Sequence, residues 1–126
     1  MVAYSRRMSA SSSSVLECLK GEQLSAVTFV QDYLQLHFDG PCLNGYVWPS
    51  IEVGNSKCQF NEPGYRDKLC TLIAKKVLDA TASEDEFLRI EFIDGSRIEF
   101  SLSPSDREGP EAVMLQDAER KNWNVW

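Results

Sequence analysis

The segments YLQLHFDG at 33–40 and FLRIEFIDG at 87–95 decide the fold that the sequence predicts. In both, large apolar residues alternate with polar ones, so one face of an extended strand becomes apolar. Leu36 and Ile90 take equivalent places, and we expect both in the core. Each segment ends in Asp-Gly, which favours a tight turn because glycine accepts a positive φ. Two β-hairpins follow, with their second strands expected at 42–48 and 96–102.

Sliding the sequence against itself extends the match beyond the hairpins. One more strand is expected before each hairpin, at 24–30 and 76–82, and a helical stretch is expected before each of those strands. Each half of the chain therefore reads as α-β-β-β. The matched positions are Leu19, Gly21, Leu24 and Val27 in the first half and Leu72, Ala74, Val77 and Ala80 in the second.

These patterns predict an α+β fold of two α-β-β-β repeats in a mainly antiparallel sheet arrangement, followed by a C-terminal β-hairpin. A chain of 126 residues suits one domain. One six-stranded sheet with helices on one side and two small packed sheets both fit the pattern. The expected divisions are a flexible tail at 1–10 and a domain at 11–126, composed of repeat one at 11–53, a loop at 54–66, repeat two at 67–103 and the hairpin at 111–126.

Charge and cysteine spacing narrow the possible partners. The net charge of −6 has the wrong sign for binding nucleic acid or an anionic membrane. No apolar run approaches the ~20 residues of a membrane span. The four cysteines are widely separated, so we expect reduced thiols, no metal and no cofactor. The chain does not open with a signal-peptide pattern, which predicts a cytoplasmic location.

Catalytic motifs are missing from the sequence. His37 is the single histidine, and alternation places it on the polar face of its strand. There is no GxSxG elbow and no glycine-rich phosphate loop. A non-catalytic role is therefore favoured. The alternative is a small-ligand-binding protein or hydrolase with a pocket between the repeats, which would need His37 beside a carboxylate.

Aromatic residues mark the candidate binding surface, because tyrosine, tryptophan and arginine are enriched at interfaces. The loop at 54–66 is long and polar, as functional loops often are. The side chains of Tyr46 and Trp48 could instead pack under the other sheet or the C-terminal hairpin. The candidate binding residues are Tyr46 and Trp48, at the end of the strand that leads to the loop, and Tyr65 and Arg66.

The order of LKG at 19–21, YLQLHFDG, VWP at 47–49, FLRIEFIDGSRIEFSL at 87–102 and the closing WNVW resembles a small bacterial domain of unknown function. The resemblance covers nearly the whole chain and implies no activity. Similar small, acidic, duplicated α+β domains include immunity proteins, which neutralise toxins by binding them. By this analogy we expect an interaction domain that recognises a protein partner or another copy of itself.

Overall fold

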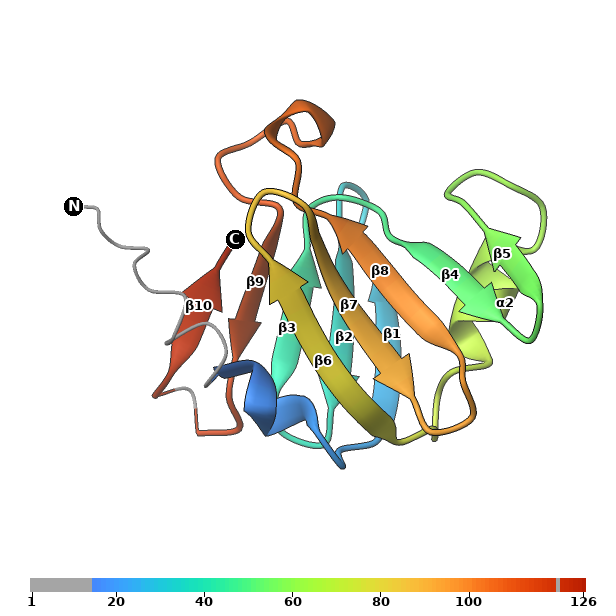
Figure 1. The fold of residues 1–126 in the computed structure, drawn as a ribbon, viewed down its shortest axis with the longest axis horizontal. Coiled ribbons are helices and arrows are strands. Elements are labelled where there is room, and N and C mark those ends of the chain that lie inside the picture. The colour runs from blue at the N-terminus through green and yellow to red at the C-terminus, as the bar shows by residue number, and fades with distance from the viewer. Residues whose placement is uncertain (1–14, 120) are drawn as a thin grey trace.

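The computed structural model describes residues 15–119 and 121–126, which form two five-stranded antiparallel β-sheets (Figure 1). The first sheet has the strand order β1-β2-β3-β9-β10, and the second has the order β5-β4-β8-β7-β6. The strands are β1 (Leu24–Phe29), β2 (Leu34–Phe38), β3 (Cys42–Gly45), β4 (Ser50–Val53), β5 (Ser56–Cys58), β6 (Val77–Ser83), β7 (Phe87–Phe92), β8 (Arg97–Ser101), β9 (Val113–Gln116) and β10 (Trp123–Val125).

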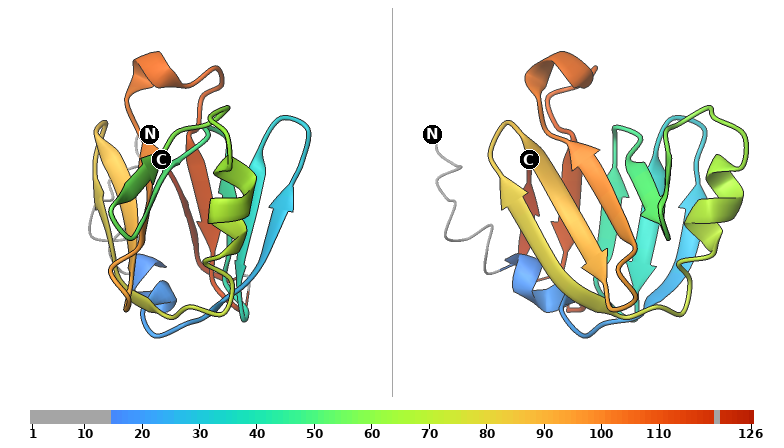
Figure 2. Two further views of the ribbon diagram at one scale, coloured as in Figure 1. Left: turned by 90° about the vertical axis from the view of Figure 1, so that its right-hand side faces the viewer. Right: turned by 45° about the vertical axis from the view of Figure 1, so that its right-hand side comes forward.

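The two sheets face each other with the core between them (Figure 2). Their inner faces carry the apolar residues of the predicted alternation, and Leu36 and Ile90 are both fully buried as expected. Helical structure is scarce. The helix α2 (Tyr65–Cys70) contacts β4 of one sheet and β1 of the other, whereas the 3-10 helix η1 (Glu17–Leu19) contacts β6. A second 3-10 helix, η2 (Pro104–Asp106), follows β8.

The predicted hairpins are confirmed. Strand β2 pairs with β3, β7 pairs with β8, and the terminal strands β9 and β10 pair with each other. Of the two arrangements left open, the one with two packed sheets is correct, because each hairpin lies in a sheet of its own. The helical part of the predicted α+β fold is smaller than expected, and the structure is mostly antiparallel sheet.

Reciprocal backbone hydrogen bonds join the segment that leads into β1 to the segment that leads into β6. The N–H of Gly21 donates to the carbonyl of Val77 at 2.9 Å, and the N–H of Ala74 donates to the carbonyl of Leu24 at 2.7 Å. Gly21 and Ala74 have φ values of 81° and 82°. Ala74 therefore holds a left-handed conformation that glycine adopts more easily.

Gly45 allows the sheets to approach closely. Its partner in β2 is Leu34, just as the partner of Phe100 in β7 is Leu88. A Cβ atom added to Gly45 would lie 2.4 Å from Cε2 of Phe100, which is fully buried. The missing side chain on one sheet thus makes room for the phenylalanine ring on the other.

Two sequence-based boundaries were wrong. The strand expected at 42–48 ends at Gly45, because the chain then crosses from the first sheet to the second, where β4 begins at Ser50. The expected loop at 54–66 contains all of β5, and α2 begins at Tyr65. Strand β5 pairs with β4 and extends the second sheet by one strand. The tail expected at 1–10 lies outside the described residues.

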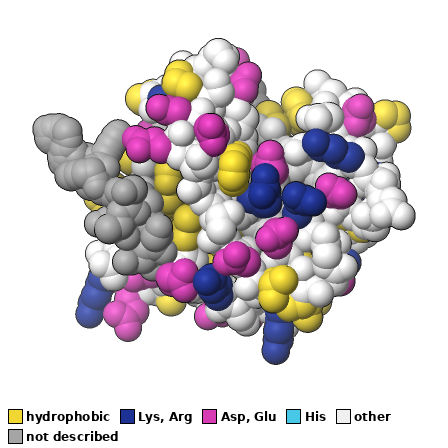
Figure 3. Space-filling model, in the orientation of Figure 1, with side chains coloured by type: hydrophobic (Ala, Val, Ile, Leu, Met, Phe, Trp, Pro, Cys, Tyr) yellow, Lys and Arg dark blue, Asp and Glu magenta, His cyan; other side chains and the backbone are white. Residues whose placement is uncertain are grey.

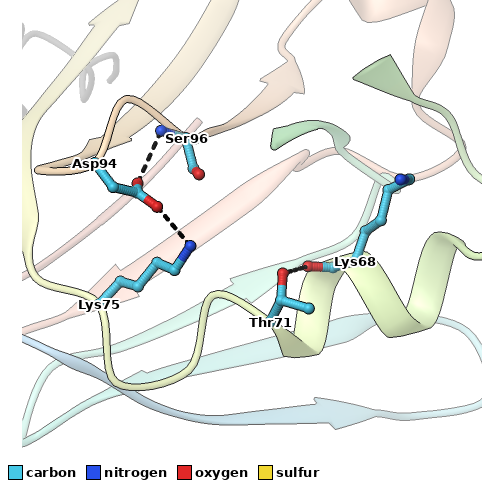
Figure 4. A network of polar contacts seen from close by, with 5 residues as sticks. All are labelled: Lys68, Thr71, Lys75, Asp94 and Ser96. Atoms are coloured by element: carbon cyan, nitrogen blue, oxygen red, sulfur yellow. Dashed lines mark hydrogen bonds and ion pairs between the residues drawn. The ribbon is translucent and has the colours of Figure 1, made fainter. Parts of the chain in front are cut away.

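An ion pair between Lys75 and Asp94 links the segment between α2 and β6 to the turn between β7 and β8 (Figure 4). The ammonium of Lys75 donates to a carboxylate oxygen of Asp94 at 2.5 Å, and the other oxygen accepts from the N–H of Ser96 at 2.9 Å. These bonds lower the pKa of Asp94 to about 2, with the Lys75 contact as the largest cause. Separately, the hydroxyl of Thr71 donates to the carbonyl of Lys68 at the C-terminal end of α2.

Candidate functional site

The outward side of the second sheet is rich in charged side chains, and Figure 3 views the molecule from this side. Acidic and basic residues are neighbours across β5, β4, β8 and β7, and we call this surface the charged face. Its charged members are Glu52 on β4, Lys57 on β5, Asp79 on β6, Arg89 and Glu91 on β7, and Arg97 and Glu99 on β8.

Ion pairs connect neighbouring strands of the charged face. Arg89 donates to the carboxylate of Glu99 at 2.8 Å, and its guanidinium lies 4.3 Å from the ring centroid of Phe87. Arg97 and Glu52 are 3.4 Å apart. About a third of each of these charged side chains is exposed, so each pair adds about 1 kcal/mol or less to stability. Covering this surface would remove the remaining water from these charged groups, which is costly.

The outward side of the first sheet is built differently. One row of side chains crosses all five strands, and the next row runs parallel to it. Among the described residues, neither row contains Asp, Glu, Lys or Arg. We call this surface the uncharged face. The first row is Ala26, His37, Cys42, Gln116 and Trp123, the second is Thr28, Gln35, Asn44, Met114 and Val125, and Tyr33 and Tyr46 extend it beyond the strand ends.

Polar and aromatic contacts run along the uncharged face. The rings of Tyr33 and Tyr46 lie 5.6 Å apart, and the amide of Asn44 is 3.5 Å from the hydroxyl of Tyr46. Two large side chains remain open to solvent: Tyr46 is 37% exposed and Trp123 is 60% exposed. Large exposed aromatic side chains beside polar groups that both donate and accept are typical of protein contact surfaces.

The structure does not bring all four sequence-predicted binding residues together, although Trp48 and Tyr65 both contact Phe60. Tyr46 belongs to the uncharged face, where it contacts Tyr33. Trp48 lies beyond the strand end and stacks on Phe60, with ring centroids 4.5 Å apart. Arg66 lies elsewhere again, with its guanidinium 5.4 Å from the ring centroid of Phe29.

Tyr65 is a core residue and is only 4% exposed. Its hydroxyl donates to the carbonyl of Pro49 at 2.5 Å, and its ring packs edge-on against Phe60. Burial raises the pKa of Tyr65 well above its usual value. Its side chain therefore holds α2 against the start of β4 and is not open to a partner, contrary to what its place in the expected loop suggested.

The surroundings of His37 offer little for catalysis. Its ring nitrogen Nε2 lies 3.4 Å from the hydroxyl of Thr28, and its direct cross-strand neighbour is Cys42. Among the described residues, no three side chains of the metal-binding types gather in one place. Burial is the main reason that the pKa of the Cys18 thiol is raised to about 11, which keeps that thiol protonated and unreactive at neutral pH.

The contrast between the two faces could have been read from the sequence. In YLQLHF the residues between the apolar positions are Gln35 and His37, whereas in FLRIEF they are Arg89 and Glu91. Alternation places these residues on the outward sides of the strands, but their difference in charge was not used to locate a binding surface. The row across β9 and β10 could not be added until the sheet order was known, because β3 and β9 are far apart in the chain.

Comparison with protein-family models, with curated proteins and with solved structures finds no match. No helix in the described part of the chain is long and apolar enough to span a membrane.

Proposed function

We propose that the protein is a non-catalytic interaction domain that binds a protein partner through the uncharged face. The supporting observation is that the two rows of outward side chains that define this face contain no Asp, Glu, Lys or Arg, although a quarter of the sequence is charged. Contact through it would bury tyrosine, tryptophan and amide side chains without removing water from an ion.

The opposite surface explains why one face suits this role and the other does not. Covering the charged face would remove water from ion pairs such as Arg89–Glu99 and Arg97–Glu52. In a partly buried setting the attraction between the ions repays that loss only where the geometry is good. A partner therefore gains more from contact with the uncharged face.

We infer that 11–53 and 67–103 are two copies of one α-β-β-β repeat. The reciprocal bonds of Gly21 and Ala74 support the inference, and so does the same irregularity of register at the start of β1 and of β6. On this basis, the two outward faces began alike and then diverged. The second copy kept a solvated surface, while the first became a surface for contact.

Two double variants test the proposal: one adds an ion pair to the uncharged face, and the other removes an ion pair from the charged face. Neither changes the net charge. Gln35→Arg together with Asn44→Glu writes the Arg89–Glu99 pair onto the uncharged face, because Gln35 lies opposite Asn44 as Arg89 lies opposite Glu99. The matched control, Arg89→Gln with Glu99→Asn, removes that pair from the charged face. Each variant and the wild type are immobilised and used to capture proteins from the cells that naturally make this chain.

We expect the wild type and the control variant to capture the same protein, and the Gln35→Arg, Asn44→Glu variant to lose it. Thermal unfolding of all three proteins checks that they are folded. Equal capture by all three folded proteins would move the contact surface elsewhere and contradict the proposal. Capture lost only with the control variant would assign binding to the charged face.

A further inference from the structure

We propose that the partner bound by the uncharged face is a second copy of the same chain, so that two copies pack face to face in a homodimer. This inference rests on the proposed function and names its partner. It rests on the lack of charge on the uncharged face, on the chemistry of its outward side chains and on the size of the face.

Electrostatics favours an occupant whose contact surface carries no charge. A chain with a net charge of −6 attracts basic partners, but charged groups on such a partner would find no opposite charge on the uncharged face. They would lose hydration there without compensation. The occupant therefore needs an uncharged contact surface of its own. A second copy of this chain has one.

In a dimer with two-fold symmetry, both copies contribute the same patch. A side chain near the two-fold axis contacts the same side chain of the other copy. A lysine or a glutamate is unfavourable there because like charges repel. The amides of Gln35 and Asn44 and the hydroxyl of Thr28 each carry both a donor and an acceptor. Each of them can therefore pair with an identical group, so the uncharged face is complementary to itself.

The size of the uncharged face is compatible with a weak dimer interface. Strands lie about 4.8 Å apart and rise about 3.4 Å per residue, so a five-stranded face of this length measures roughly 20 Å in each direction. Allowing for the relief of the side chains, two such faces would bury on the order of 1,000 Å² in total, at the lower end for specific interfaces. We therefore expect a reversible dimer with a Kd in the micromolar range. Tyr46 and Trp123 are its anchor residues, because they are the large exposed aromatic side chains on the face.

The chain offers a matched pair of variants for the test. Thr28 lies opposite Gln35 on edge strand β1, and Thr81 lies opposite Arg89 on edge strand β6; both threonines are exposed. Thr28→Glu adds a negative charge to the uncharged face, whereas Thr81→Glu adds the same charge to the charged face. Asn44→Asp adds a charge at the middle strand with almost no change of shape, and it replaces Thr28→Glu if that variant unfolds.

Sedimentation analysis of the full chain from about 1 to about 500 µM brackets the expected Kd. We expect the wild type and Thr81→Glu to pass from monomer to dimer over this range, and Thr28→Glu and Asn44→Asp to weaken the dimer at least about tenfold. A wild type that stays monomeric throughout overturns the inference. So does a dimer that all variants form equally well.

Alkylation of two cysteines, Cys42 and Cys70, reports which surface the dimer buries. Cys42 is on the uncharged face, and Cys70 is exposed on α2 outside it. Their alkylation is followed by mass spectrometry at low and at high protein concentration. We expect labelling of Cys42 relative to Cys70 to fall as the wild type dimerises and to stay constant in Thr28→Glu. A dimer with an unchanged ratio uses another surface and contradicts the inference.

Failure of this inference can be told apart from failure of the proposed function. If the chain is monomeric but capture of another protein is lost with Gln35→Arg and Asn44→Glu, the uncharged face binds a different partner and only the homodimer is wrong. If the chain is monomeric and capture is equal for all folded variants, both are wrong.

Discussion

The inward-facing side chains of the two sheets are alike in being apolar, whereas the outward-facing side chains differ in charge. Leu36 and Ile90 occupy corresponding places at the centres of β2 and β7, and both are fully buried. Beside them, outward-facing Gln35 corresponds to Arg89, and His37 corresponds to Glu91. Burial limits what the inner positions can hold, because a change of volume there costs packing energy. The outer positions are free of that limit, and their difference therefore says more about function.

The largest expected effect tests whether the inner designs are equivalent. Leu36→Ala and Ile90→Ala each remove a fully buried side chain, and each is expected to lower the free energy of unfolding by about 2–5 kcal/mol. Urea denaturation monitored by tryptophan fluorescence measures both. A loss below about 1 kcal/mol for either variant would show that the two sheets do not share the core equally.

The second prediction concerns a place where the inner faces differ in size, Gly45 in the first sheet and Phe100 in the second. Gly45→Ala is expected to lower the free energy of unfolding by about 1–3 kcal/mol, because the new Cβ would meet the ring of Phe100. Adding Phe100→Leu should recover part of this loss, whereas Phe100→Leu alone should destabilise. The double-mutant cycle measures the coupling between the two positions. Additive losses would mean that they do not contact each other.

Alternation and turn residues were sufficient to predict the two long hairpins. The two strands of each hairpin are close together in the sequence, so the pattern that specifies them is local. They were insufficient for β4 and β5, which have four and three residues and too little alternation to stand out. The pairing of β5 with β4 brings Cys58 into the core opposite Ile51. Short strands of this kind depend on contacts with the rest of the sheet, which local sequence does not contain.

The candidate site was only partly predictable for the same reason. Tyr46 could be placed on the outward side from the alternation of its strand. Tyr65 could not be placed, because its burial depends on the docking of α2 against Pro49, which is distant in sequence. Residue type favoured both tyrosines as contact residues, but tertiary packing separated them into one exposed and one buried side chain.

That separation gives the third prediction. Tyr65→Phe leaves the carbonyl of Pro49 without the hydroxyl that donates to it, and we expect a loss of about 1–2 kcal/mol in the free energy of unfolding. Tyr46→Phe removes a hydroxyl from a residue that is 37% exposed, where water can replace it, and should change stability by less than about 0.5 kcal/mol. Equal effects in urea denaturation would contradict the different burial of the two side chains.

The smallest expected effect compares the two Asp-Gly turns. In the second sheet, Asp94 is bonded to Lys75 and to the N–H of Ser96, and its pKa falls from the usual 3.8 to about 2. A carboxyl whose pKa is lower in the folded state stabilises the fold above the unfolded pKa and loses this contribution as pH falls toward the folded value. The window is therefore about pH 4 to pH 2. Because 40% of the Asp94 side chain is exposed, solvent screening keeps the contribution below about 1 kcal/mol.

Asp94→Asn should therefore lower the free energy of unfolding at pH 7 by this small amount, and it should make that free energy less dependent on pH between about pH 4 and pH 2. Asp39→Asn in the first sheet is the control, since Asp39 contacts Ser25 through its own backbone N–H, which the substitution retains. Urea denaturation of both variants between pH 2 and pH 7 measures the difference, and identical profiles would show that the ion pair to Lys75 does not stabilise the turn.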